Sequence, residues 1–172
     1  QGVQVHDAVA KLSKPSDVRL EGDRYDHHVT RLAPAATPRK LATLEFGAHK
    51  LAGVFFGLAD GFDESAFDVA GNAPERSEAV ISCVEAATAR WIDGVPETRR
   101  SVREIRERLL DDESLNQVRE TFNLDWIADF EEREIQAKWA CCHGDLHGCN
   151  VLVSPTEVTL IDYGDVGDGP AS

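Results

Sequence analysis

The sequence of 172 residues contains no run of eighteen apolar residues, so no stretch is predicted to form a transmembrane helix. It also lacks an N-terminal segment in which positive charges precede an apolar core, as a secretory signal peptide requires. Its four cysteines, two of them adjacent, do not form the spaced framework of a secreted disulfide-linked domain. We therefore expect a cytoplasmic protein with reduced thiols and no membrane partner.

Positive charge is also scarce, because 18 Lys and Arg residues face 31 Asp and Glu residues, for a net charge of −13. A nucleic-acid-binding surface needs clustered basic side chains, so we expect no nucleic-acid partner. An acidic cleft would raise the local concentration of amines, which is compatible with a cationic small-molecule substrate. The acidity can equally serve only solubility, so charge alone selects no substrate.

The side chains best suited to catalysis or metal binding lie near the C-terminal end. The segment HGDLHGCN at 143–150 precedes two apolar triplets within 151–160, which flank a Ser-Pro-Thr-Glu turn and predict a β-hairpin. A hairpin brings the far ends of its strands together, so Asn150 and Asp162 should lie within reach of one ion. Asp145, across the same loop, offers a carboxylate that can act as a base. Asn and Asp oxygens are ligands that Mg²⁺ accepts when phosphates complete its shell.

This ordered set resembles the catalytic loop and metal-binding triplet of the protein-kinase-like fold. In the form HGDLHxxN followed by IDYGD it is similar to the aminoglycoside phosphotransferase and choline kinase family. The resemblance implies an α+β fold, with a partial antiparallel N-lobe sheet, helix C and a mainly helical C-lobe. It also implies ATP and Mg²⁺ as cofactors and a small-molecule hydroxyl as acceptor. Asp145 would then be the catalytic base, and Asn150 and Asp162 the metal ligands.

A lysine and a glutamate near the N-terminus complete this resemblance. Lys11 stands in a β-leaning apolar run over residues 3–12, where a buried ammonium needs a partner. Ser16 is a candidate N-cap for a helix to about Leu32, and Glu21 falls on its apolar stripe. The two side chains resemble the strand lysine and helix-C glutamate that kinases use on ATP phosphates. The alternative is that both lie at solvated margins.

Two further strand-like runs, at residues 41–46 and 51–59, flank a turn that contains glycine. They would complete the partial N-lobe, which we expect over residues 1–62. The second run ends where the resembling kinases have their hinge. Backbone groups of Ala59 and Gly61 are therefore candidates for hydrogen bonds to adenine.

The partial C-lobe is expected over residues 63–172, beginning with a connecting loop at 63–73. Apolar periodicity and end signals predict four helices: one from Pro74 to just before Gly94, one over 97–110, one opening at the Ser114-x-x-Gln117 capping box, and one over 125–138. These helices carry no chemistry of their own. In the resembling small-molecule kinases such helices shape the acceptor pocket.

A zinc site is an alternative for the segment 141–149. Cysteines and histidines between Cys141 and Cys149 are good zinc ligands, but adjacent cysteines on a strand face opposite ways and no second Cys-x-x-Cys pair exists.

The sequence has no G-x-G-x-x-G in residues 1–10 and stops eight residues after Gly164. We therefore expect either the interior piece of a longer domain or a domain trimmed at both ends.

The rival to a small-molecule kinase is a catalytically inactive kinase-like module that binds nucleotide or partners, within a larger bacterial signalling or defence protein. A third hypothesis is phosphorylation of protein, and the sequence has no activation segment from which to judge it. The sequence indicates neither the acceptor nor the oligomeric state.

Overall fold

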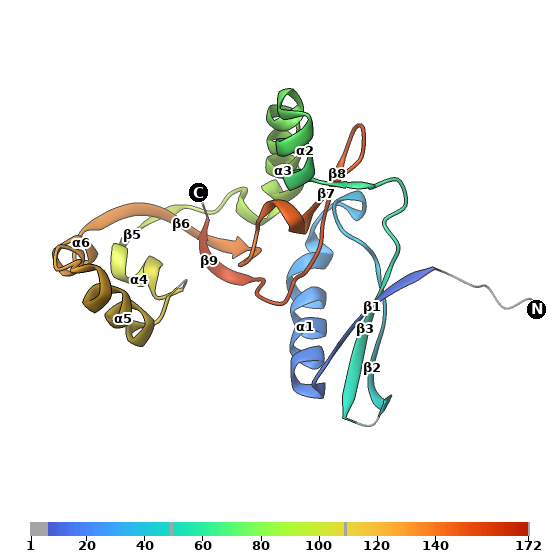
Figure 1. The fold of residues 1–172 in the computed structure, drawn as a ribbon, viewed down its shortest axis with the longest axis horizontal. Helices are drawn as coiled ribbons and strands as arrows, with labels where there is room; N and C mark the ends of the chain where they lie inside the picture. The colour runs from blue at the N-terminus through green and yellow to red at the C-terminus, as the bar shows by residue number, and fades with distance from the viewer. Residues whose placement is uncertain (1–6, 49, 109, 172) are drawn as a thin grey trace, which may run out of the picture. The chain divides into compact units, whose positions relative to one another are not determined.

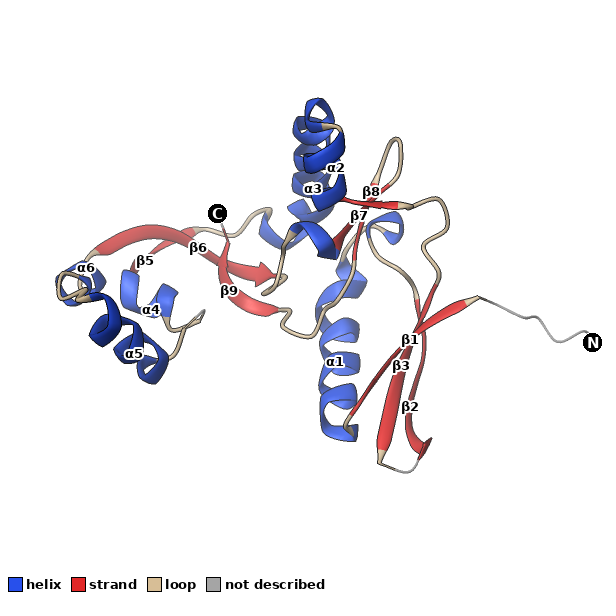
Figure 2. Cartoon of the chain, viewed as in Figure 1, coloured by secondary structure: helices blue, strands red, loops and turns tan. Residues whose placement is uncertain are grey.

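The computed structural model describes residues 7–48, 50–108 and 110–171, which combine small antiparallel sheets with several helices (Figures 1 and 2). Contacts divide the chain into two compact units. The first comprises Gln1–Trp91 and His143–Gly167, and the second comprises Ile92–Cys142 and Asp168–Ser172. The α+β class is confirmed. The lobe boundary after residue 62 stays a prediction.

The first sheet has the strand order β1-β3-β2, from β1 (Ala8–Ser13), β3 (Leu51–Gly57) and β2 (Lys40–Ala48). Helix α1 (Pro15–His28) packs beside it and is followed by the 3₁₀ turn η1 (Val29–Arg31). Alternate side chains of β3 pack against the helix and are buried. Ala52 and Val54 form a cluster with Val18 of α1, and Phe56 packs against this cluster.

The start of α1 differs from the prediction. Lys14 is the N-cap and Pro15 the first helical residue, so Ser16 lies inside the helix and is not its N-cap. Proline suits the first helical position because a backbone N–H there has no acceptor within the helix, so its absence costs no hydrogen bond. The predicted stripe is confirmed, since Val18, Glu21 and Tyr25 are buried.

The second sheet contains the predicted hairpin. Its strand order is β4-β7-β8, from β4 (Glu64–Ser65), β7 (Val151–Val153) and β8 (Val158–Leu160). The 3₁₀ turns η2 (Pro34–Ala36) and η4 (Gly148–Asn150) belong to the same unit. The turn between the hairpin strands is closed by Ser154, whose N–H donates to the Glu157 carbonyl at 2.9 Å.

Helix α2 (Ala66–Asn72) occupies residues that we expected to form a loop, so that prediction is wrong. It begins at a reciprocal capping box, in which the Ser65 hydroxyl and the Asp68 carboxylate each accept from the other's backbone N–H. Next come the 3₁₀ turn η3 (Pro74–Arg76) and helix α3 (Ser77–Ile92), which match the first predicted C-lobe helix.

The second unit is built on a sheet that periodicity did not predict, with the order β5-β6-β9. Its strands are β5 (Glu97–Ser101), β6 (Glu134–Cys142) and β9 (Gly167–Ala171), and its helices are α4 (Val102–Arg106), α5 (Asp112–Phe122) and α6 (Ile127–Glu131). The predicted helices over 97–110 and 125–138 are therefore wrong in part, because β5 and β6 pair with each other from Glu97 opposite Lys138 to Ser101 opposite Glu134.

Helix α5 begins earlier than the predicted capping box at Ser114. Its N-cap is Asp111, whose carboxylate accepts from the Ser114 N–H at 2.7 Å. The helix ends at Asn123, which adopts a left-handed conformation with φ 52°. None of the helices in the described residues is long and apolar enough to cross a membrane.

Candidate functional site

Lys11 on β1 lies between two carboxylates. Its Nζ is 2.6 Å from Asp162 Oδ1 and 3.0 Å from Glu21 Oε2. Burial alone would lower the pKa of Lys11, but the hydrogen bonds with Asp162 and Glu21 outweigh it, so the pKa is raised overall. The lysine is therefore a fixed positive charge, and the predicted Lys11 and Glu21 pair is formed.

The hairpin aligns Asn150 with the segment that carries Asp162. Val151 pairs with Leu160, and the Ile161 N–H donates to the Asn150 carbonyl at 3.0 Å, which extends the ladder by one step. Burial would raise the pKa of Asp162, but the hydrogen bond and charge of Lys11 outweigh it and leave the pKa lowered. Asp162 is thus an ionised carboxylate, one residue beyond the Ile161 N–H that bonds the Asn150 carbonyl.

The Asn150 side chain is buried and braces the loop that precedes it. Its Nδ2 donates to the Asp145 carbonyl at 2.9 Å and lies 3.4 Å from Asp145 Oδ2. Both Asp145 oxygens are acceptors, which assigns the nitrogen of the amide to this side, and His147 Nε2 lies 3.2 Å from the same nitrogen. The Asn150 amide oxygen and Asp145 Oδ1 have no partner among the described residues, and both are therefore available to a ligand.

His143 links this loop to the segment Ile161–Tyr163. Its Nε2 lies 3.0 Å from the Ile161 carbonyl, and its ring packs against that of Tyr163 with centroids 5.2 Å apart. Burial lowers the pKa of His143, so the imidazole is neutral and donates through Nε2–H. This geometry suits a structural role for His143.

The sequence did not point to Arg24, which ties helix α1 to the Asp162 loop. Its Nη1 donates to the Gly164 carbonyl and lies 3.8 Å from Asp165 Oδ1. Arg24 stands three residues after Glu21, and residues at that spacing share a helix face. That spacing is the signal that could have found it.

Tyr163 and Gly144 complete the attachment of this loop. Tyr163 is buried, donates to the Leu160 carbonyl at 2.7 Å and packs edge-on against Tyr25 of α1. Gly144 has φ +85°, and a Cβ there would overlap the Asp165 backbone. Only glycine satisfies both conditions without strain.

A cavity of about 470 Å³ opens beside Lys11. One end of it is charged, with Lys11, Glu21 and Asp162 in its wall. The rest is mostly apolar, and its lining includes Val9, Ala10, Phe56, Leu58, Ala59, Leu152 and Ile161. A largely apolar cavity with a cation and carboxylates at one end can take a ring system with an anionic tail.

The comparison with protein families decides the identity of this fold. The model of the phosphotransferase enzyme family (APH) matches residues 2–172. The chain belongs to this family. Its structure is similar to the apo crystal structure of a thermostable mutant of the aminoglycoside phosphotransferase APH(4)-Ia, with a TM-score of 0.58 and 18% sequence identity. The alignment covers 98% of this chain and 63% of that one, and at this identity it shows the fold alone. No curated protein sequence matches the chain.

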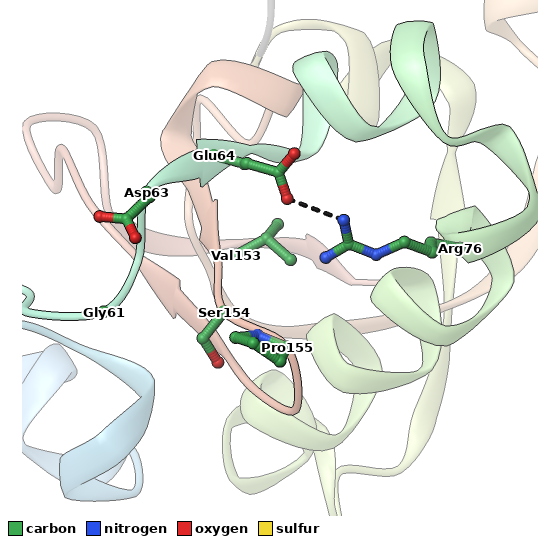
Figure 3. A pocket seen from close by; sticks show the side chains of 7 residues that line it. All are labelled: Gly61, Asp63, Glu64, Arg76, Val153, Ser154 and Pro155. Atoms are coloured by element: carbon green, nitrogen blue, oxygen red, sulfur yellow. Dashed lines mark hydrogen bonds and ion pairs between the residues drawn. The ribbon is translucent and has the colours of Figure 1, made fainter.

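For this member of the phosphotransferase enzyme family, the two predicted hinge residues lie in different places. The hinge candidate Ala59 lines the cavity beside Lys11. Gly61 instead lines a second pocket of about 470 Å³, together with Asp63, Glu64 and Arg76 (Figure 3). An ion pair of 2.7 Å joins Glu64 to Arg76 across that pocket. The roles of Ala59 and Gly61 towards adenine stay predictions.

The zinc alternative finds no support in the described part of this family member. Within the described part of the chain, no three side chains of His, Cys, Asp or Glu are arranged to hold a metal. Asn150 and Asp162 offer an amide and a carboxylate, which fit an ion that phosphate oxygens also ligate.

Proposed function

We propose that this phosphotransferase moves the γ-phosphoryl group of ATP to a hydroxyl group of a small molecule. The observation that carries the proposal is the position of Lys11, paired with Glu21 and Asp162 at the charged end of an apolar cavity. Adenine would occupy the apolar part, near Ala59, with the phosphates towards Lys11. Family membership supports phosphoryl transfer, while ATP as donor and the class of acceptor are our inference.

Asn150 and Asp162 would hold Mg²⁺ through the amide oxygen and the carboxylate. The ion would supply charge neutralisation on the nucleotide phosphates. Lys11 would add a second positive charge there, and Glu21 would hold the ammonium in place. Phosphoryl transfer depends on positioning and electrostatics more than on covalent chemistry by the protein, so this small set of residues is sufficient.

Asp145 would act on the acceptor. The acceptor oxygen attacks the γ-phosphorus, the bond from that phosphorus to the bridging oxygen of ADP breaks, and the hydroxyl proton passes to the Asp145 carboxylate. Its Oδ1 has no partner among the described residues and is the atom available to the hydroxyl. The net charge of −13 favours hydroxylated amines as the first acceptors to test.

The test is transfer of labelled phosphate from ATP to a panel of aminoglycosides, choline and amino alcohols, with Asp145→Asn as the comparison. We expect Mg²⁺-dependent product in the wild type and a loss of at least about a hundred-fold in kcat for the variant. Near wild-type turnover in Asp145→Asn would remove the base from the proposal. Nucleotide binding without transfer to any acceptor would favour the inactive module.

A further inference from the structure

The first sheet, with the order β1-β3-β2, has one face covered by helix α1 (Figure 2). Side chains of all three strands contact this helix: Lys11 of β1 pairs with Glu21, Glu45 of β2 pairs with Arg19, and Ala52 and Val54 of β3 pack with Val18. Successive residues of a strand point to opposite faces of a sheet. The residues that alternate with these contacts therefore face away from α1.

The residues that face away from α1 include no polar or charged side chain. They are Ala8, Ala10 and Leu12 on β1, Ala42, Leu44 and Phe46 on β2, and Leu51, Gly53, Phe55 and Gly57 on β3. We call this set the outer face. A sheet that packs a helix on one face and meets water on the other normally alternates apolar with polar side chains. The outer face instead has the composition of a buried surface.

The large side chains of the outer face are nevertheless exposed. Their exposed fractions are 57% for Leu12, 53% for Leu44, 86% for Phe46 and 45% for Leu51. A Cβ at Gly53 would lie 2.9 Å from Leu12 Cδ2 and 3.0 Å from Phe55 Cε2, so these two side chains lie over the glycine. They fill the centre of the outer face, which suits packing against another sheet face.

We propose that the outer face is the interface of a homodimer, in which it packs on the outer face of a second copy of this chain. Its exposed leucines, phenylalanine and alanines present roughly 500 Å² per copy, if a fully exposed large side chain counts for about 150–250 Å². Two copies would bury about 1,000 Å² in total, which is the lower end of the range for specific interfaces. We therefore expect a dimer that is in equilibrium with the monomer.

The distribution of charge favours a second copy as the occupant. The net charge of −13 makes two copies repel each other. The outer face carries no charge, so two copies can meet there without placing carboxylates opposite each other. A twofold interface must be complementary to itself, and an uncharged apolar face meets this condition. Lys11 points to the other face of the sheet, so this dimer leaves the cavity beside Lys11 open.

Sedimentation equilibrium of the 172-residue chain tests the dimer directly. We expect a monomer–dimer equilibrium with a dissociation constant on the order of 10–100 μM, because the buried area is small. Added NaCl should tighten it, since salt screens the repulsion between two acidic copies and leaves the apolar contact intact. A chain that is monomeric up to millimolar concentration would overturn the proposal, as would a dimer that dissociates when salt is added.

Variants show whether the outer face forms the interface. Phe46→Lys and Leu44→Lys should each weaken the dimer at least about ten-fold, because a lysine there would be buried against its own copy. Phe67→Lys is the matched control, since Phe67 on α2 is 68% exposed and lies outside the sheet. It should leave the dissociation constant unchanged. A dimer that survives both outer-face variants, or that is weakened equally by Phe67→Lys, would overturn the proposal.

Amide NMR locates the contact without any substitution. We expect the ¹H–¹⁵N shifts of Leu12, Leu44 and Phe55 to change as the wild-type chain is concentrated, and those of helix α5 to stay constant. Concentration-dependent shifts confined to other elements would overturn the proposal. Circular dichroism and the melting temperature should show that the lysine variants stay folded, because the substituted side chains are exposed in one copy. Neither measurement depends on phosphoryl transfer, so the dimer and the proposed function can fail independently.

Discussion

Lys11 lies closer to Asp162, at 2.6 Å, than to Glu21, at 3.0 Å. The ammonium thus contacts the carboxylate that we assign to Mg²⁺. Binding of Mg·ATP would give Asp162 a second cation and give Lys11 a phosphate partner. Lys11 would then exchange one anion for another while Glu21 holds it, which keeps its charge compensated throughout.

This pairing predicts how stability depends on pH. The pKa of Asp162 is lowered from 3.8, so its contribution is present above that value and is lost as pH falls through the lower folded pKa. The pKa of Lys11 is raised from 10.5, so its contribution is present below that value and is lost as pH rises through the higher folded pKa.

Between these limits the free energy of unfolding should fall by no more than about 1 kcal/mol in Asp162→Asn, because both groups are partly exposed. Urea unfolding of wild type and variant across the pH range measures this difference. We expect the two curves to converge at acid pH. A difference that persists below the folded pKa of Asp162 would contradict the assignment.

Gly144 should tolerate no side chain. Gly144→Ala would place a Cβ onto the Asp165 backbone at φ +85°, so we expect a loss of at least about 1–3 kcal/mol in the free energy of unfolding. Gly71→Ala is the matched control, because no atom lies within 4 Å of a Cβ there and the site is inside helix α2. Chemical denaturation should show that change to be neutral or stabilising by up to about 1 kcal/mol. Equal effects of the two substitutions would refute the close approach of the loops.

Arg24 should matter for binding of Mg·ATP although it lies outside the cavity lining. Arg24→Ala removes the donor to the Gly164 carbonyl and loosens the segment that carries Asp162, so we expect the KM for Mg·ATP to rise about ten-fold. Arg19 is the matched control, since it lies on the same helix and pairs with Glu45. Steady-state kinetics should leave Arg19→Ala unchanged. Similar KM values for the two variants would show that the tether has no role in binding.

The sequence predicted the hairpin and the Lys11–Glu21 pair because both depend on local patterns. Apolar triplets around a proline turn specify a hairpin, and helical spacing places Glu21 on the buried face of α1. The sequence contains the capping pair Ser65 and Asp68, but the polar composition around it favours a loop.

The sheet of the second unit was not predictable in the same way. The pairing of β5 with β6 joins segments far apart in the chain, and the polar run Glu97–Ser101 has no strand signal of its own. The alternation along β6 overlaps with a helical pattern, so tertiary pairing decides between them. The spacing of Arg24 after Glu21 places both on one helix face, but its long-range partner, the Gly164 carbonyl, appears only once the fold is known.

The most direct test of the account is calorimetric titration of the 172-residue chain with ATP, with and without Mg²⁺. Asp162→Ala serves as the test variant, and Asp63→Ala, in the pocket of Figure 3, serves as a matched acidic control. We predict binding that requires Mg²⁺, is lost in Asp162→Ala and is preserved in Asp63→Ala. Binding that ignores Mg²⁺, or that survives in Asp162→Ala, would contradict the nucleotide site.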